Sequence, residues 1–176
     1  MSLLNEDRLF PVEPSLRALA RALYDSVATL PIISPHGHCD PRWFAENKRF
    51  PNPAELFVIP DHYVFRMLVS QGVALEDLGV PRVDGGPVET DPRKIWRRFA
   101  AHQHLFRATP SAMWLGHAFG EVFGLTEPLT ADTADAYYDR IDALLDQPEF
   151  RPRALSDRFR IEALATTESA LDDLKW

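Results

Sequence analysis

The sequence is poor in cysteine, in long apolar runs and in basic residues. Cys39 is the only cysteine among 176 residues, which excludes a disulfide bond within the chain. No apolar run reaches the roughly 18 residues that a membrane-spanning helix needs. Residues 1–10 include Glu6, Asp7 and Arg8 and lack the apolar segment of a signal peptide. We therefore expect a soluble cytoplasmic protein in a reducing compartment, without a membrane partner.

The charge balance argues against a nucleic-acid partner. The 19 Lys and Arg residues are outnumbered by 26 Asp and Glu residues, which gives a formal net charge of −7. Sequence-independent nucleic-acid binding neutralises phosphates with basic side chains, which this chain has in short supply. Hydrophobic residues make up 45% of the chain, enough for a globular core. A small molecule is the partner that this composition favours.

Most of the chain carries helix signals. Pro14 suits the first turn of a helix whose apolar residues recur at helical spacing as far as Ala28. Elsewhere an N-capping residue opens the helix, and in three cases proline follows the cap. These caps are Asp40, Asp61, Asp91, Thr109 and Thr130, and they predict helices over 41–47, 62–71, 92–107, 110–123 and from Thr130 through Leu145. Residues 82–87 form the most loop-like stretch.

Two short apolar runs predict strands, one at about 30–36 and one at about 160–167. The first is interrupted by prolines and is too short for a helix, so we interpret it as a buried strand of a parallel sheet. A helical block at about 50–150 separates the two strands. A complete (β/α)8 barrel needs eight strands and about 250 residues. The order therefore indicates an α/β protein: the opening part of a larger fold with a largely α-helical insertion after its first strand.

The motif His36-Gly37-His38 at the end of the first predicted strand is the strongest candidate for a chemical role. Alternate residues of a strand point to the same face, so the two imidazoles can converge on one ion. Neutral imidazoles suit Zn²⁺ and similar divalent metals, and the carboxyl end of a barrel strand is where catalytic groups gather. Two solvated loop histidines are the alternative, and for so short a motif they are the commoner outcome.

Asp61-His62-Tyr63 is a second candidate, placed at a predicted helix start. Free N–H groups and a partial positive charge there favour a carboxylate or hydroxyl-rich ligand. His62 and Tyr63 could each supply a proton. An ordinary capped helix with a half-buried Tyr63 is the alternative, which the pattern alone favours.

Other histidines and aromatic residues fit structural roles better. His102 and His104 lie two apart within a predicted helix, and so on roughly opposite sides of it, which argues against a shared metal. Cys39 follows His38 on the other face of the strand, so we leave it out of the site. An aromatic-rich stripe at helical spacing predicts core packing; it comprises Trp96, Phe99, Phe106, Met113, Trp114, Phe119 and Phe123.

Several stretches, in the right order over nearly the whole chain, resemble the amino-terminal part of uronate isomerases, members of the amidohydrolase superfamily. They are residues 31–41 (PIISPHGHCDP), 49–56 (RFPNPAEL), 61–67 (DHYVFRM), 72–73 (GV), 114–115 (WL), 119–124 (FGEVFG), 166–167 (TT) and 172–174 (DDL). The resemblance implies that residues 1–176 are the first part of a metal-dependent-hydrolase-like TIM (β/α)8 barrel.

The resemblance also implies a site and a reaction. His36 and His38 would bind a divalent metal, usually zinc, and His62 and Tyr63 would contact the sugar acid and take part in catalysis. The family interconverts D-glucuronate with D-fructuronate and D-galacturonate with D-tagaturonate. Its carboxylate-binding arginine and a further metal-binding aspartate lie downstream of these residues. We therefore expect the isolated chain to hold zinc weakly and to be an inactive fragment.

Two other hypotheses remain open at this point. A metal-dependent hydrolase of the same superfamily would share His36 and His38 but would have no reason to keep Asp61-His62-Tyr63. A complete, non-enzymatic, mostly helical interaction protein would need neither motif. The sequence does not select between the two uronates, does not identify the metal, and leaves open whether a homo-oligomer forms.

Overall fold

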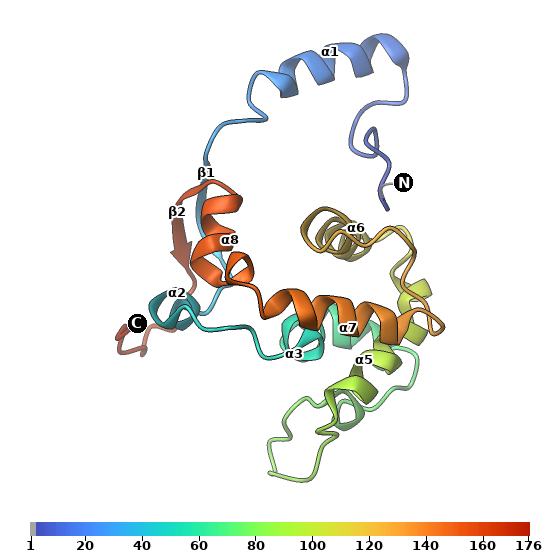
Figure 1. Cartoon of the computed structure of the whole chain (residues 1–176), viewed down its shortest axis with the longest axis vertical. Helices are drawn as coiled ribbons and strands as arrows, with labels where there is room; N and C mark the ends of the chain where they lie inside the picture. Colours follow the sequence, from blue (N-terminus) through green and yellow to red (C-terminus); the bar gives the residue numbers. More distant parts are fainter. Residues whose placement is uncertain (1–2) are drawn as a thin grey trace. The chain divides into compact units, whose positions relative to one another are not determined.

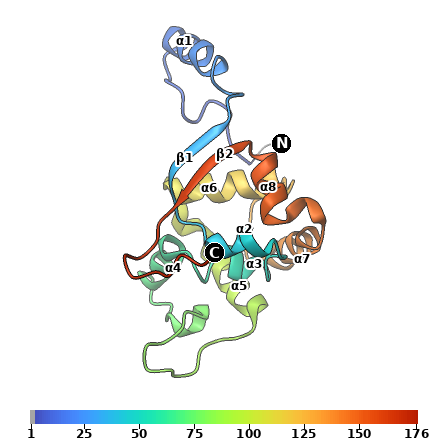
Figure 2. The same cartoon turned by 90° about the vertical axis from the view of Figure 1, so that its left-hand side faces the viewer.

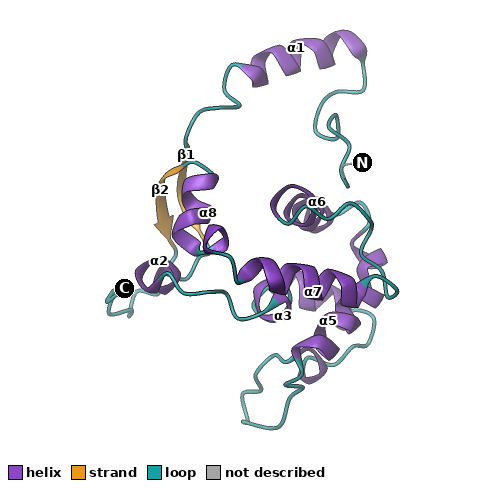
Figure 3. Ribbon diagram, in the orientation of Figure 1, coloured by secondary structure: helices purple, strands orange, loops and turns teal. Residues whose placement is uncertain are grey.

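The computed structural model describes residues 3–176, which form two compact units. One consists of residues 3–5 and 50–146 and is helical; the other consists of residues 6–49 and 147–176 and contains both strands. Helices predominate throughout, as Figures 1 and 3 show. Over these described residues, no helix is both long enough and apolar enough to cross a membrane.

The helical unit contains five α-helices joined by turns and longer loops. They are α3 (Pro53–Phe57), α4 (His62–Val69), α5 (Pro92–Ala101), α6 (Pro110–His117) and α7 (Ala134–Leu145). Shorter helical turns lie at Glu76–Leu78 and Gln103–Phe106, and a π-helical turn lies at Ala118–Val122. The caps predicted at Asp61, Asp91 and Thr109 are confirmed, since each side chain accepts hydrogen bonds from backbone N–H groups of the first turn.

The core of this unit is largely aromatic. Trp96, Phe99 and Phe106 are fully buried, and Phe119 and Phe123 are nearly so, which confirms the predicted packing role of these residues. The prediction is wrong for Trp114, whose side chain is 59% exposed. Leu115 and Phe119 are buried and lie four residues apart, so they share the core-facing side of the helix and leave Trp114 on its flank.

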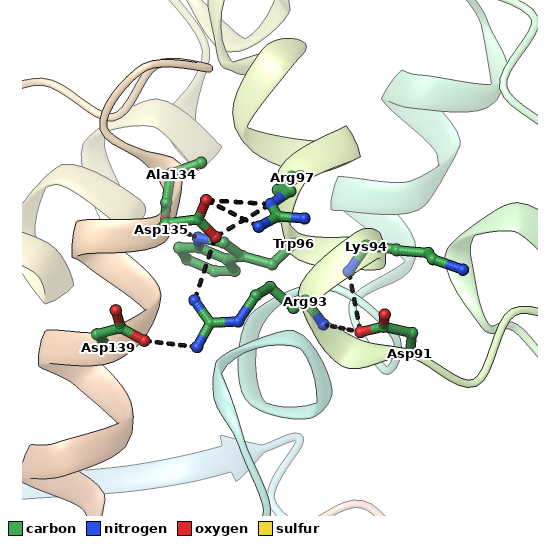
Figure 4. A network of polar contacts seen from close by, with 8 residues as sticks. All are labelled: Asp91, Arg93, Lys94, Trp96, Arg97, Ala134, Asp135 and Asp139. Atoms are coloured by element: carbon green, nitrogen blue, oxygen red, sulfur yellow. Dashed lines mark hydrogen bonds and ion pairs between the residues drawn. The ribbon is translucent and has the colours of Figure 1, made fainter.

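Charged side chains join α5 to α7 at the edge of this core (Figure 4). Arg93 donates to Asp135 at 3.1 Å and to Asp139 at 2.5 Å. Arg97 donates to both carboxylate oxygens of Asp135, with Nη2 at 2.9 Å from Oδ2. The guanidinium of Arg93 also lies over the ring of Tyr138, 4.3 Å from its centroid. The two helices are thus held by a network of interactions rather than by one isolated ion pair.

Four predicted helices in this unit have different boundaries. The helix predicted over 62–71 ends at Val69, and the one predicted over 110–123 is α-helical to His117 and π-helical from Ala118 to Val122. The helix predicted over 92–107 ends at Ala101, and residues 103–106 form a tighter 3₁₀ turn. The helix predicted after Thr130 begins at Ala134. Thr130 and Thr133 instead bind each other: Thr133 Oγ1 accepts from the Thr130 N–H, and Thr130 Oγ1 accepts from the Thr133 N–H. This reciprocal turn occupies the residues that would otherwise start the helix.

The second unit contains α1 (Pro14–Asp25), β1 (Ile32–Gly37), α2 (Pro41–Glu46), α8 (Pro152–Arg158) and β2 (Ile161–Thr166). The strands lie side by side and parallel, with Ile32 opposite Ile161 and Gly37 opposite Thr166 (Figure 2). Parallel pairing was predicted and is confirmed. Because parallel strands end at the same edge of a sheet, the residues that follow β1 and β2 come together.

The prediction that the first strand is buried is wrong. Ile32 is 48% exposed and Ile33 is 68% exposed. A parallel strand is buried only when further structure covers both of its faces. Among the described residues β1 pairs with β2 alone, and the apolar side chains of β1 are left open.

The position of α2 is set by Arg153 of α8. Its Nε donates to the carbonyl oxygen of Phe44 at 2.7 Å, and its Nη2 donates to that of Ala45 at 3.0 Å. Asn47 ends α2 in the left-handed conformation, with φ of 49°, and its side chain accepts from the Arg153 N–H. Asp40 caps the other end of α2, as predicted. The segment that follows β1 is therefore fixed at both ends.

Candidate metal centre and substrate pocket

His36 and His38 face each other at the carboxyl end of β1. Their Nε2 atoms are 2.9 Å apart, and their ring centroids are 4.8 Å apart with an interplanar angle of 70°. Both side chains are exposed. The alternation of an extended backbone puts the two imidazoles on one side, as the spacing predicts. The structure thus brings these two predicted residues together, with one ring nitrogen of each side chain turned toward the other.

Gly37 allows the strands to approach closely beside the histidine pair. A Cβ atom at this position would lie 2.5 Å from Leu164 Cδ1 and 3.3 Å from the carbonyl oxygen of Ala165. The first distance is far below van der Waals contact, so any side chain at position 37 would push against β2. A larger residue here would have to displace the end of the Leu164 side chain and would press on the Ala165 carbonyl oxygen, so glycine fits this position with the least disturbance of β2.

A cavity of about 540 Å³ opens beside the histidine pair, at the edge where both strands end. Its size is that of many small-molecule sites. The polar and charged side chains that line it come from the end of β2 and from the segments following β1 and β2, and they are His38, Asp40, Arg42, Thr166, Thr167, Glu168 and Asp172. Arg42 forms an ion pair with Asp40 at 3.4 Å. Such a lining suits a ligand with many hydroxyl groups.

The histidine pair fits part of a zinc site. Two nitrogens bound to one tetrahedral zinc at about 2.0–2.1 Å are roughly 3.3 Å apart, a few tenths of an ångström more than in this pair. Catalytic zinc usually has three protein ligands. Within residues 3–176, no group of three or more His, Cys, Asp or Glu side chains is placed to hold a metal. The donor set among these residues would supply two of the ligands of such a site.

Cys39 lines the same cavity, where burial favours the neutral form of its thiol. Its side chain is half-buried, and burial raises the pKa of the thiol above its usual value. Metal binding requires a thiolate, which burial disfavours. The cavity therefore has a neutral thiol in its wall beside His38.

His62 and Tyr63 begin α4 in the helical unit. Asp61 Oδ1 accepts from the N–H of Tyr63 at 2.8 Å and from that of Val64 at 3.3 Å, which fixes the first turn. The two rings lie close together, with centroids 4.2 Å apart and planes tilted by 33°. Tyr63 is 56% exposed, which is more than expected of a half-buried residue that only packs. Its ring contacts that of Trp114 edge to face, with the ring centroids 6.2 Å apart.

His102 and His104 do not lie on opposite sides of a helix. Because α5 ends at Ala101, the two rings come to lie nearly parallel, with centroids 6.3 Å apart. The Nδ1 atom of His102 is 2.7 Å from the carbonyl oxygen of Arg98. That contact satisfies the ring within the helix end, which supports the predicted structural role of His102.

Comparison with known proteins identifies the family. The family model described as glucuronate isomerase matches residues 8–176, almost the whole chain. The chain belongs to the glucuronate isomerase family. It is 59% identical over its full length to the uronate isomerase of Mesorhizobium japonicum and 56% identical over 99% of its length to that of Rhizobium meliloti. It spans 38% and 37% of those two proteins.

Two solved structures of the glucuronate isomerase family have the same fold over this region. The glucuronate isomerase of Caulobacter crescentus matches 94% of the chain with a TM-score of 0.89 and 59% identity. The uronate isomerase of Thermotoga maritima matches 94% with a TM-score of 0.79 and 25% identity. The matched part is 34% and 33% of those chains. The fold of this region is thus retained in a relative with only a quarter of its residues identical.

Sequence reasoning in this glucuronate isomerase family member missed the residues that line the cavity after each strand. Arg42, Thr167 and Glu168 were not singled out, because none belongs to a recognisable metal or catalytic motif. A general rule could have found them. In parallel α/β folds the site lies beyond the carboxyl ends of the strands, so residues just after each predicted strand are candidates whatever their type.

Proposed function

We propose that this chain is the amino-terminal part of an isomerase that interconverts hexuronates with their keto forms, D-glucuronate with D-fructuronate and D-galacturonate with D-tagaturonate. Membership of the glucuronate isomerase family supports the substrate class. The observation that carries the proposal is the pairing of the His36 and His38 nitrogens at the end of β1, beside a polar cavity.

The metal in this proposal is a divalent ion, with zinc preferred, held by His36 and His38. The chemistry of two imidazole nitrogens at the observed spacing supports it. When bound, such an ion supplies Lewis-acid polarisation of a substrate carbonyl or hydroxyl oxygen. Two histidines are too few for a tight site, so we propose that the isolated chain holds zinc weakly.

Proton transfer in this proposal uses His62 and Tyr63. Isomerisation removes a proton from C2 and returns one to C1 through an enediol-like intermediate, while the hydroxyl proton moves between the two oxygens. That sequence needs a base, an acid and donors for the developing oxyanion. Both side chains are exposed on a capped helix start, where they are free to meet a ligand.

The complete architecture in this proposal is a (β/α)8 barrel with the helical unit inserted after the first strand. Two features of the sheet unit support it. The strands are parallel and adjacent, as consecutive barrel strands are. The apolar side chains of β1 and of α1, such as Leu19 and Leu23, are more than 45% exposed, as expected of surfaces that a larger fold covers. A complete, compact helical protein would not leave them open.

The test begins with the reading frame that encodes this chain. We expect the complete product to convert D-glucuronate to a ketouronate, seen by NMR as loss of the anomeric proton signals. We also propose that it resides in the cytoplasm, in keeping with the single cysteine among these 176 residues. Amide and ester substrates serve as controls for the hydrolase alternative, and the 176-residue chain alone should show no turnover. Robust isomerisation by the isolated chain would contradict the proposal.

The histidine pair is then tested in the complete protein. H36N and H38N should each lower zinc occupancy and isomerase activity together, because each removes a ligand. H104N is the matched control, since His104 lies in the helical unit beside His102. If H36N and H38N retain both zinc and activity, the assignment of the metal site is wrong, whatever the substrate.

A further inference from the structure

The carbonyl oxygen of Gly37 accepts two hydrogen bonds from one residue. Thr167 approaches it with its N–H at 3.1 Å and with its hydroxyl at 3.4 Å. Thr167 is the first residue after β2, so these bonds extend the parallel ladder one residue past the end of the strand. They join the segment after β2 to the residue that separates His36 from His38.

The Gly37 carbonyl belongs to the peptide that leads into His38. The orientation of this carbonyl therefore helps to fix the backbone position from which the His38 side chain projects. The backbone position of His36 is fixed by the strand before it. A peptide held by two donors has less freedom to rotate than one held by the ladder bond alone. The spacing of the two imidazole nitrogens, 2.9 Å, is a property of this short segment.

We propose that Thr167 is a positioning residue for the metal-binding pair, acting through the Gly37 carbonyl, and that the lack of a side chain at Gly37 lets β2 pack closely beside the pair. Thr167 itself contributes no ligand. It also lines the cavity beside His38, so the same side chain connects the cavity wall to the histidine spacing. This inference rests on the proposed metal site.

The hydroxyl group and the branched shape of Thr167 can be tested separately by substitution. T167V removes the hydroxyl but keeps the branched shape and the backbone N–H, whereas T167S keeps the hydroxyl. Thr29 is an exposed threonine in the same unit, so T29V is the matched control for the same chemical change elsewhere. All are made in the complete protein, and thermal unfolding followed by circular dichroism checks that each variant folds.

Zinc affinity is measured by competition with a chromogenic chelator, and Co²⁺ absorption reports the ligand geometry. We expect T167V to weaken zinc binding about 3- to 10-fold, the effect of one lost hydrogen bond, and to alter the Co²⁺ spectrum. The zinc affinities of T167S and T29V should stay within about twofold of that of the wild type. Wild-type affinity and an unchanged spectrum in T167V would overturn the inference.

Gly37 gives an independent test of the same geometry. G37A should weaken zinc binding by more than T167V does, because its Cβ would meet Leu164 Cδ1 at 2.5 Å. L164A removes that obstacle, so the double variant G37A/L164A should recover part of the affinity. No recovery together with a normal T167V would count against the proposed arrangement of the two strands.

Failure of the proposed metal site is recognised separately. If the wild type binds no zinc, or if H36N binds it as tightly as the wild type, the metal site and this inference both fall. If H36N loses zinc while T167V and G37A keep it, the metal site stands and the positioning role is wrong.

Discussion

The indole Nε1–H of Trp96 donates a hydrogen bond of 2.8 Å to the carbonyl oxygen of Ala134, and so joins α5 to the first residue of α7. Both residues are buried, with Trp96 fully inaccessible to solvent. Around this bond the rings of Phe99, Phe119 and Tyr138 lie with their centroids 5.3–6.4 Å from that of Trp96. One side chain thus satisfies a buried carbonyl and fills the centre of the helical core.

We expect W96F to destabilise the chain by about 1–3 kcal/mol, since it removes a buried donor and part of the indole volume. Urea unfolding followed by far-ultraviolet circular dichroism measures the change. W114F is the matched control, because Trp114 is largely exposed and the same substitution there should cost less than about 0.5 kcal/mol. Equal effects of the two substitutions would contradict the assigned role of Trp96.

Asp135 makes the stability of the interface between α5 and α7 depend on pH in the acidic range. Hydrogen bonds from Arg97 first, and then from Arg93, hold the pKa of the Asp135 carboxyl below its ordinary value of 3.8. Its contribution to stability is therefore complete above pH 3.8 and is lost as the pH falls through the folded-state pKa. We expect D135N to lower stability at pH 7 and to shrink the loss seen on acidification.

This prediction is measured as the urea midpoint at pH 7 and at pH 3, in low salt and in 1 M NaCl. Salt should reduce the effect, because the ion pairs are exposed to solvent. D132N, at an exposed carboxylate outside the network, is the control and should leave both midpoints close to those of the wild type. If D135N and D132N behave alike, the network does not stabilise the helix pair.

The features predictable from sequence were those encoded by neighbouring residues. Asp61, Asp91 and Thr109 were correct as caps because a cap depends on its own side chain and the next three residues. The pairing of His36 with His38 was equally local, since strand alternation decides it. The resemblance added the family, which the family model confirms and which no local rule contains.

The features that could not be predicted depend on contacts distant in sequence. The exposure of β1 depends on which segments cover it, and the strand's own apolar run says nothing about them. Thr130 is the predicted cap, but its reciprocal bonds with Thr133 occupy both residues, and α7 begins only at Ala134. Thr167 reaches Gly37 across 130 positions of sequence, a contact that no pattern in a single sequence reports.

Tyr137 makes stability depend on pH in the alkaline range, with the opposite sign to that of Asp135. Its ring is buried and its hydroxyl donates to the carbonyl oxygen of Glu127. Burial, with a smaller contribution from the charge of Glu127, raises the pKa of Tyr137 to about 12 from its ordinary value of 10. The stabilisation is therefore complete below pH 10 and is lost as the pH rises through 12.

We expect the wild type to lose stability between pH 10 and 12, with tyrosinate absorbance at 295 nm rising as unfolding proceeds. Y137F should be about 0.5–1.5 kcal/mol less stable at pH 7, from the lost hydrogen bond, and should show a smaller alkaline loss. Y24F is the control, since Tyr24 is 54% exposed. An alkaline loss of the same size in Y137F and the wild type would refute the assignment.

Asp61 offers a substitution that tests the helix start on which His62 and Tyr63 lie. Its carboxylate accepts from the N–H groups of Tyr63 and Val64, so D61A should cost about 1 kcal/mol of stability, the usual value of a lost N-cap. D61S restores an acceptor without the charge and should recover most of the loss.

Because a frayed first turn would displace both aromatic side chains, D61A should also lower kcat/KM for D-glucuronate in the complete protein, and D61S should restore it. If D61A loses stability but keeps full activity, the orientation of His62 and Tyr63 does not limit the reaction, and their proposed part in proton transfer is wrong.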